Sequence, residues 1–253
     1  MTVKELYDRM SERSPESLRM DWDNDGIMCC TDTSAEVRRV LVTLDVTEEV
    51  AEYAIKGGFD LIISHHPLIF RPLPAITDEN HISRKVIKLI NGGVSVFSFH
   101  TRADAVSGGV NDILADLVGL YSTECFGEGG LGRIGELDEE LSLDDFASGV
   151  KLSLGVDTVR VSDGYNTVKK VAVVGGDGKD FLKDAIAAGA DTFVSGRIGY
   201  NIMVEASEMG INLIEAGHFF TEQPVTEFFA NTVHHIAPEI YVQTVSSNLI
   251  KII

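Results

Sequence analysis

Short apolar runs alternate with amphipathic segments along most of the chain. Runs rich in Val, Ile, Leu and Phe predict strands, and segments with apolar residues three or four positions apart predict helices. Strands that alternate with helices favour an α/β fold with mixed, mostly parallel sheets. The predicted strands are Arg39–Val46, Leu61–Ser64, Val94–Phe99, Val168–Val174, Thr192–Val194 and Ile211–Ile214. The predicted helices are Thr47–Lys56, Gly109–Leu117, Lys179–Ala188 and Tyr200–Met209, and another ends over Val86–Asn91.

Two parts of the chain repeat one another. The segment AIKGGFDLIIS at Ala54–Ser64 aligns with AIAAGADTFVS at Ala185–Ser195. Further on, GGVSVFSFH at Gly92–His100 aligns with GINLIEAGH at Gly210–His218, and an acid follows each final histidine after three residues. Because the matches occur in the same order, they indicate an internal duplication and hence two α/β halves.

The stretch between the repeats has a different composition. Residues 121–145 are rich in Gly, Glu and Asp and lack a strong period, which is typical of a connection. We therefore expect a first α/β half at residues 1–120, a connection at 121–145 and a second half at 146–253.

Composition favours a soluble, cytoplasmic protein. Apolar residues make up 44% of the chain, yet no apolar run approaches the roughly 20 residues that span a membrane. The N-terminal Met1–Arg13 segment mixes apolar and charged residues and lacks the apolar stretch of a signal peptide. The three cysteines, Cys29, Cys30 and Cys125, show no disulfide spacing, so we expect Cys29 and Cys30 to be small, partly buried side chains.

Charge argues against nucleic acid as a partner. The formal net charge is -18, and a strongly acidic surface repels phosphate backbones. We therefore expect neither nucleic acid nor a membrane as a partner.

Histidines and acids follow three of the predicted strands. Ligands in open α/β sheets bind beyond the carboxyl ends of the strands, so side chains from several strand ends can converge there. Any one pair would suit an ordinary polar loop, but three together favour a metal site. The pairs are His65 with His66, His100 with Asp104, and His218 with Glu222.

The type and number of these ligands predict the ions. Imidazole combined with carboxylate suits zinc, iron, manganese or nickel better than magnesium or calcium. Six candidate ligands exceed the need of one tetrahedral ion. We therefore expect two divalent transition-metal ions that share a carboxylate.

Two other motifs carry weaker signals. The segment Gly130–Gly135 (GLGRIG) matches the dinucleotide fingerprint. No predicted strand leads directly into it and no helix follows, so we expect a solvated connecting loop instead of a dinucleotide site. The alternative is that Arg133 of this loop lines a substrate pocket. Trp22 stands in the acidic turn Asp21–Gly26 and is expected to anchor that turn on the core.

Taken together, the motifs resemble the NIF-three-like family, whose members are also described as GTP cyclohydrolase I type 2 homologs and dinuclear metal-centre proteins. The resemblance runs nearly end to end. It is carried most specifically by SHHPLIF and GHxxxE in this order, with DWDNDG, LVTLDV, HTRAD and GLGRIGEL as weaker elements.

The family resemblance implies two interlinked α/β halves that form one compact unit, and it also implies roles for particular residues. It implies metal ligands at His65, His66, Asp104, His218 and Glu222, with Glu222 as the bridge between the two ions. His100 would then stand beside the metal or act in catalysis. Proteins similar to this one assemble as toroidal hexamers, so the resemblance also implies a homohexamer.

Two function classes fit these residues. In a metal-dependent hydrolase, the ions lower the pKa of a shared water, the resulting metal-bound hydroxide attacks a small or nucleotide-like substrate, and His100 transfers protons. In a non-catalytic metal-binding, metal-delivery or regulatory scaffold protein, the same ligands serve without a substrate. The sequence leaves open the native metal, the substrate and the choice between these classes.

Overall fold

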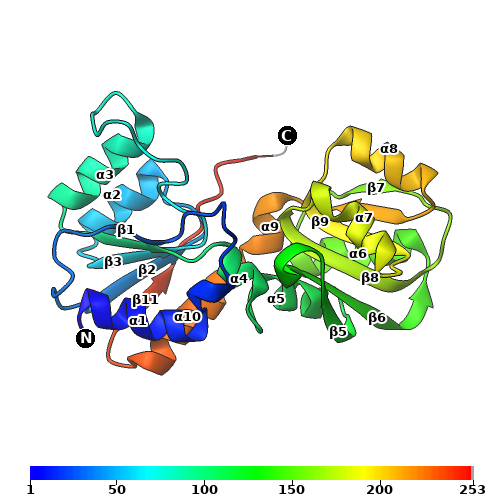
Figure 1. Cartoon of the computed structure of the whole chain (residues 1–253), viewed down its shortest axis with the longest axis horizontal. Helices are drawn as coiled ribbons and strands as arrows, with labels where there is room; N and C mark the ends of the chain where they lie inside the picture. The colour runs from blue at the N-terminus through cyan, green and yellow to red at the C-terminus, as the bar shows by residue number, and fades with distance from the viewer. Residues whose placement is uncertain (252–253) are drawn as a thin grey trace. The chain divides into compact units, whose positions relative to one another are not determined.

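The computed structural model describes residues 1–251 and divides the chain into two compact units, each built on its own sheet (Figure 1). The first unit contains Met1–Val106 together with the chain from Val225 onward. The second unit contains Ser107–Pro224, so it is inserted into the sequence of the first.

The first unit has a five-stranded sheet with the strand order β1-β4-β3-β2-β11. The strands are β1 (Gly26–Cys29), β2 (Arg39–Thr43), β3 (Leu61–Ser64), β4 (Ser95–Ser98) and β11 (Tyr241–Thr244). All pairs are parallel except β1 with β4. The helices are α1 (Val3–Arg13), η1 (Glu16–Leu18), α2 (Glu48–Lys56), α3 (His81–Asn91), α4 (Thr101–Ala105) and α10 (Val225–Ile236).

Helices cover both faces of this sheet, which explains the apolar strands. In Figure 1, α2 and α3 lie on one face and α1 and α10 on the other. Val40, Leu41 and Val42 of β2 are all fully buried, because alternate side chains point to opposite covered faces. The helix α2 begins at Thr47, whose hydroxyl accepts a hydrogen bond from Val50 N at 3.1 Å.

The second unit has a six-stranded sheet with the order β5-β6-β8-β9-β10-β7. The pairs β8–β9 and β9–β10 are parallel, and the other pairs are antiparallel. The strands are β5 (Tyr121–Phe126), β6 (Gly132–Leu141), β7 (Arg160–Ser162), β8 (Val168–Asp177), β9 (Thr192–Arg197) and β10 (Asn212–Glu215). The helices are α5 (Val110–Leu117), η2 (Glu128–Gly130), α6 (Leu143–Leu154), η3 (Lys179–Phe181), α7 (Leu182–Ala187), α8 (Tyr200–Glu208) and α9 (His218–Glu222).

Side chains of β8 show how this second core is layered. Val171 and Val173 join a buried cluster with residues of α5 and α6. Ala172 and Val174 join another cluster with residues of α7 and α8. The predicted α/β class with two mixed sheets is thus confirmed, and the parallel pairs predominate in the first sheet.

The division of the chain differs from the one predicted. Residues 121–145 are no connection, because they form β5, β6 and the start of α6. The chain from Val225 onward returns to the first unit as α10 and β11, so the second half does not extend to residue 253 as expected. Most of β5 is exposed at a sheet edge, and its polar side chains hid the strand period.

One finding concerns membranes. Across residues 1–251, no helix combines the length and the apolar character that crossing a bilayer requires.

The three cysteines are free thiols in different surroundings. Cys29 is buried in β1, and burial raises the pKa of its thiol to about 12. Cys30 is half-buried, and Cys125 is exposed on β5. The expected small, partly buried character therefore holds for the adjacent pair.

This contrast predicts the pattern of alkylation. At pH 8, a thiol with a pKa near 12 is ionised in only about one molecule in ten thousand, so Cys29 should resist iodoacetamide in the native protein, whereas Cys125 should react. Mass spectrometry of the labelled peptides measures both rates. Unfolded protein is the control, in which all three cysteines should be modified. Equal native rates at Cys29 and Cys125 would contradict the buried position of Cys29.

Candidate metal centre

The histidines of the first unit follow the ends of neighbouring parallel strands. The register pairs Thr43 of β2 with Ser64 of β3, and Ser64 with Ser98 of β4. Continued two residues past the strands, the same row contains Asp45, His66 and His100. Neighbouring strands lie about 5 Å apart, so side chains that share a row come close.

The three imidazole rings meet at this edge of the first sheet. The ring centroids lie 5.0 Å apart for His65 and His66, 5.2 Å for His65 and His100, and 5.7 Å for His66 and His100. One nitrogen from each ring lies within 4.8 Å of the others. The convergence that the sequence predicted for these three residues is therefore present.

Each ring is held through the same nitrogen. Nδ1 lies 3.0 Å from the Phe99 carbonyl oxygen in His65, 2.7 Å from Asp45 Oδ1 in His66, and 2.8 Å from Asp23 Oδ1 in His100. Carbonyl and ionised carboxylate oxygens only accept hydrogen bonds, so Nδ1 must donate. In the neutral rings Nε2 then carries the lone pair that binds metals.

Asp104 adds a carboxylate to the same group. It lies on α4, the short helix that begins directly after His100. Its Oδ1 is 3.5 Å from Nε2 of His65, the nitrogen not bonded to the Phe99 carbonyl. The first unit therefore assembles three imidazoles and one carboxylate, which is a donor set typical of transition metals.

Asp23 fixes His100 from the acidic turn. Its buried carboxylate accepts hydrogen bonds from Thr101 N at 3.0 Å and Thr101 Oγ1 at 2.6 Å, in addition to the ring of His100. Burial alone would raise its pKa, but these hydrogen bonds and the charge of His100 lower the pKa of Asp23 to about 2.

The pKa of His100 shifts in the opposite direction. Burial favours the neutral ring, but the hydrogen bond to Asp23 and the charges of Asp23 and Asp104 favour the protonated ring. The net result is a raised pKa of His100. This imidazole is therefore suited to hold a proton.

A buried ion pair ties the acidic turn to α4. Arg102 is fully buried and donates from Nε to Asp25 Oδ2 at 2.9 Å. Its guanidinium lies 4.3 Å from the ring centre of Phe99 and also donates to the Ser14 carbonyl. Asp25 Oδ2 accepts from His100 N at 3.3 Å as well, so one carboxylate joins the two segments.

Trp22 does not lie where we expected. Its side chain is 55% exposed, and its ring packs edge-on against Phe70 and His100, with centroids 6.3 Å away in both cases. The turn is anchored by Asp23 and Asp25, so Trp22 remains on the surface beside the histidine group.

A histidine and an acid also lie together within the second unit, on one helical turn. His218 and Glu222 are the first and last residues of α9, and positions four apart lie on the same helical face. Nε2 of His218 is 2.9 Å from Oε2 of Glu222. Glu222 is almost completely buried, whereas the His218 side chain is 40% exposed.

A glycine of β8 makes room for this pair. Gly176 has a φ of +65°, and a Cβ built on it would overlap with Oε1 of Glu222 and lie 3.3 Å from Nε2 of His218. The carboxylate therefore packs directly on the backbone of β8, where no side chain could fit.

Several residues outside this group can be placed. His234 and His235 are exposed on α10, as predicted, and His81 is exposed on α3. Arg133 was expected in a solvated loop or at a pocket, but it is buried in β6, where its guanidinium pairs with Asp112 and donates to the Gly130 carbonyl.

Sequence reasoning missed the residues that orient the imidazoles. Asp23 and Asp25 had been assigned to a turn, and Asp45 to the end of a strand. The sequence signal for Asp45 is its position. It stands two residues after β2, just as His66 stands two residues after β3, so the parallel register places both in one row.

Comparison with known proteins supplies the family. The sequence model of Duf34/NIF3 (NGG1p interacting factor 3) matches residues 1–251. The chain belongs to the Duf34/NIF3 family. A "GTP cyclohydrolase 1 type 2 homolog" of Clostridium perfringens is 36% identical over 232 residues, which cover 89% of this chain and 88% of the relative.

Solved structures of relatives share the fold of this Duf34/NIF3 protein. Staphylococcus aureus hypothetical protein SA1388 is 27% identical, with a TM-score of 0.89 and coverage of 100% of this chain and 99% of that one. A Bacillus cereus protein related to NIF3 is 24% identical, with a TM-score of 0.88 and the same coverage. The family resemblance of the sequence motifs is thereby confirmed.

The contact at Gly176 generates a prediction. In Gly176→Ala the new methyl group should displace the Glu222 carboxylate and weaken metal binding about tenfold or more. Gly155→Ala is the matched control, because Gly155 has a φ of +64° but nothing within 4 Å of the added carbon. Both variants carry the same left-handed backbone strain, about 1 kcal/mol. Calorimetric metal titration with thermal unfolding measures both effects, and equal loss of affinity in the two variants would contradict the steric explanation.

Proposed function

We propose that this protein binds two divalent transition-metal ions and uses them to hydrolyse a small or nucleotide-like substrate. The observation that carries the proposal is the common orientation of His65, His66 and His100. Each ring is fixed through Nδ1, so that three Nε2 atoms are available as metal ligands or proton carriers.

The proposed ligands are those that the family resemblance implies. His65, His66 and Asp104 come from the first unit, and His218 and Glu222 from the second. A single carboxylate can offer one oxygen to each of two ions, so we assign Glu222 as the bridge. This mixture of imidazole and carboxylate fits zinc, iron, manganese or nickel.

The chain's own residues would supply the remaining chemistry. When bound, two such ions lower the pKa of a water molecule and so provide a nucleophile near neutral pH. His100 would accept a proton at Nε2, because its Nδ1 is held by Asp23 and its pKa is raised. Asp23 would stabilise the resulting imidazolium without moving.

The substrate class rests on the relatives. The clostridial relative is named a GTP cyclohydrolase 1 type 2 homolog, which favours a purine nucleotide. From the same resemblance we propose a cytoplasmic homo-oligomer that forms a toroidal hexamer. A screen of nucleotides and phosphoesters at defined metal content tests the hydrolase proposal, and turnover of a nucleotide that requires metal is the expected result.

A second candidate function uses the same ligands. His65 and Glu222 are both almost completely buried, which also suits a protein that holds or delivers metal, or a regulatory scaffold. Stoichiometric metal with no turnover across the substrate screen would favour this function over hydrolysis.

The first prediction from this proposal concerns stoichiometry and the bridge. Elemental analysis of saturated protein should give two ions per chain. Glu222→Gln should weaken both sites together, because one bridge serves both ions, whereas His65→Ala should mainly weaken one. Glu227→Gln, the same change at an exposed position of α10, is the control. One ion per chain in the wild type, or loss of a single ion in Glu222→Gln, would refute the assignment.

The second prediction concerns His100. His100→Ala should retain both ions at saturating metal but lower hydrolytic turnover by about 100-fold or more, the usual contribution of a positioned proton carrier. Metal affinity could still fall about 10- to 100-fold through lost orientation of neighbouring ligands, so occupancy is measured at saturation. His81→Ala removes an exposed imidazole and should change neither quantity. Loss of one ion at saturation would make His100 a direct ligand.

A further inference from the structure

The C-terminal segment lies beside the loop that carries Asp45. The strand β11 runs parallel to β2 at the edge of the first sheet and pairs Thr244 with Val42. Val245 N donates to the Val42 carbonyl at 2.9 Å, so the pairing continues past the strand. Three residues beyond the last strand pair, the same register places Ser247 next to Asp45.

Two hydrogen bonds join Ser247 to Asp45. Asp45 N donates to Ser247 Oγ at 3.0 Å, and the Ser247 hydroxyl donates to Asp45 Oδ2 at 3.1 Å. Ser247 is only 6% exposed, whereas the side chain of Asp45 is 43% exposed. The buried serine therefore holds one oxygen of a carboxylate that is itself partly exposed.

The other oxygen of the Asp45 carboxylate contacts His66, one of the proposed metal ligands. Asp45 Oδ1 lies 2.7 Å from Nδ1 of His66, the hydrogen bond that sets the tautomer and plane of this ring. With Oδ2 bonded to Ser247, Oδ1 is directed at His66. Ser247, Asp45 and His66 thus form a continuous row across β11, β2 and β3.

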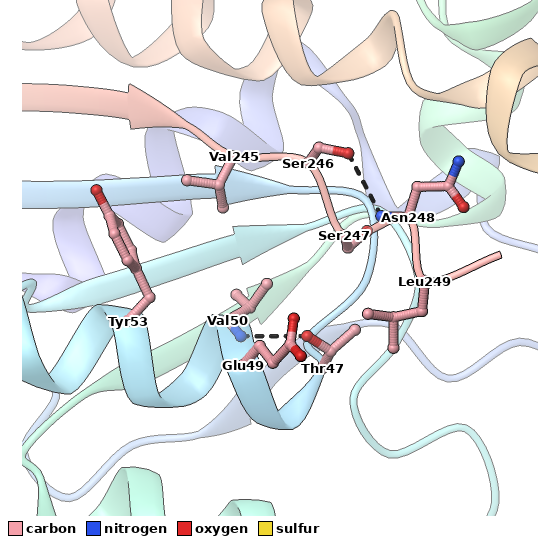
Figure 2. Close-up of a pocket in the computed structure, with 9 residues that line it drawn as sticks. All are labelled: Thr47, Glu49, Val50, Tyr53, Val245, Ser246, Ser247, Asn248 and Leu249. Carbon is pink, nitrogen blue, oxygen red and sulfur yellow. Dashed lines mark hydrogen bonds between the residues drawn. The ribbon is translucent and has the colours of Figure 1, made fainter. Parts of the chain in front are cut away.

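The C-terminal segment borders a cavity on the side of α2. Residues Val245–Leu249 and residues of α2 line a cavity of about 270 Å³ (Figure 2). Figure 2 shows Val245–Leu249 passing opposite Thr47, Val50 and Tyr53, with the hydrogen bond from Asn248 N to Ser246 Oγ within the segment. The segment is held to the sheet by the hydrogen bond from Val245 N to the Val42 carbonyl and, two residues further on, by the Ser247–Asp45 hydrogen bonds.

We propose that Ser247 is a positioning residue for the metal centre and acts through Asp45 on the orientation of His66. The inference rests on the proposed function in one respect, the assignment of His66 as a metal ligand. The described residues of the C-terminal segment, which end at Lys251, include none of the candidate metal ligands, but Ser247 controls how one imidazole is presented.

The test compares five forms of the full-length protein with the wild type. They are Ser247→Ala, Ser247→Thr, Asp45→Ala, the double variant Ser247→Ala with Asp45→Ala, and Ser246→Ala as the control. Ser246 is exposed and one position away, so its replacement deletes a hydroxyl without touching Asp45. Two quantities are measured: the dissociation constant for Co²⁺, and the tautomer of His66 in metal-free protein from nitrogen-15 resonances of its ring.

The expected results form a consistent pattern. Asp45→Ala should weaken Co²⁺ binding about 10- to 100-fold, as is usual when the hydrogen-bond partner of a ligating histidine is removed. Ser247→Ala should weaken it about fivefold, through loss of one hydrogen bond to the carboxylate. Ser247→Thr keeps the hydroxyl and should restore wild-type affinity. The double variant should bind as Asp45→Ala does, because the two residues act through one contact.

Each contrary result has a separate meaning. Ser247→Ala with wild-type affinity and an unchanged His66 tautomer would overturn the inference while leaving the metal centre intact. Additive losses in the double variant, or no rescue by threonine, would reduce Ser247 to a structural role and also overturn it. Absence of Co²⁺ binding in the wild type would instead refute the proposed function. The tautomer in metal-free protein would then still decide whether Ser247 orients His66.

Discussion

The shared register of β11, β2, β3 and β4 determines the position of the candidate ligands in the first unit. Parallel strands end at the same edge of a sheet, so residues that follow them form rows across it. One row contains Ser247, Asp45, His66 and His100, and His65 stands directly after the end of β3, one position before His66. A register shift of one residue in any of these strands would turn the side chain that follows it to the opposite face of the sheet. The candidate ligands would then no longer converge.

Orientation of the imidazoles depends on a layer of acceptors behind them. Asp23, Asp45 and the Phe99 carbonyl each hold one Nδ1 atom. The acidic turn is in turn held by the buried Asp25–Arg102 pair. Removing one partner from a buried pair leaves an uncompensated charge, which is strongly destabilising. These acceptors therefore fix the imidazole rings before any ion binds. Less conformational entropy of the side chains is then lost when an ion binds.

The sequence predicted the parts whose signal is local. The strands β2 and β3 are apolar throughout because helices cover both faces, and SHHPLIF marks the end of β3 directly. The strands β5 and β6 were missed because exposed acidic side chains obscure their period. Nothing local in α10 or β11 indicates which sheet they join. The surroundings of Asp23 and Arg133 were predicted wrongly for a similar reason. Their partners, His100 and Asp112, are distant in the sequence, so no local pattern indicates the pairing.

The insertion of the second unit into the first affects the order in which the protein can fold during synthesis. The chain leaves the first unit after Val106 and returns only at Val225. On the ribosome, the sheet of the first unit must wait for more than a hundred further residues before β11 emerges, whereas the second unit is continuous and can fold as soon as it is made. Ser247 follows β11 in the sequence, so it leaves the exit tunnel only after the whole second unit. The Asp45 carboxylate, which bonds His66, therefore gains its hydrogen bond from Ser247 only after the second unit has been synthesised.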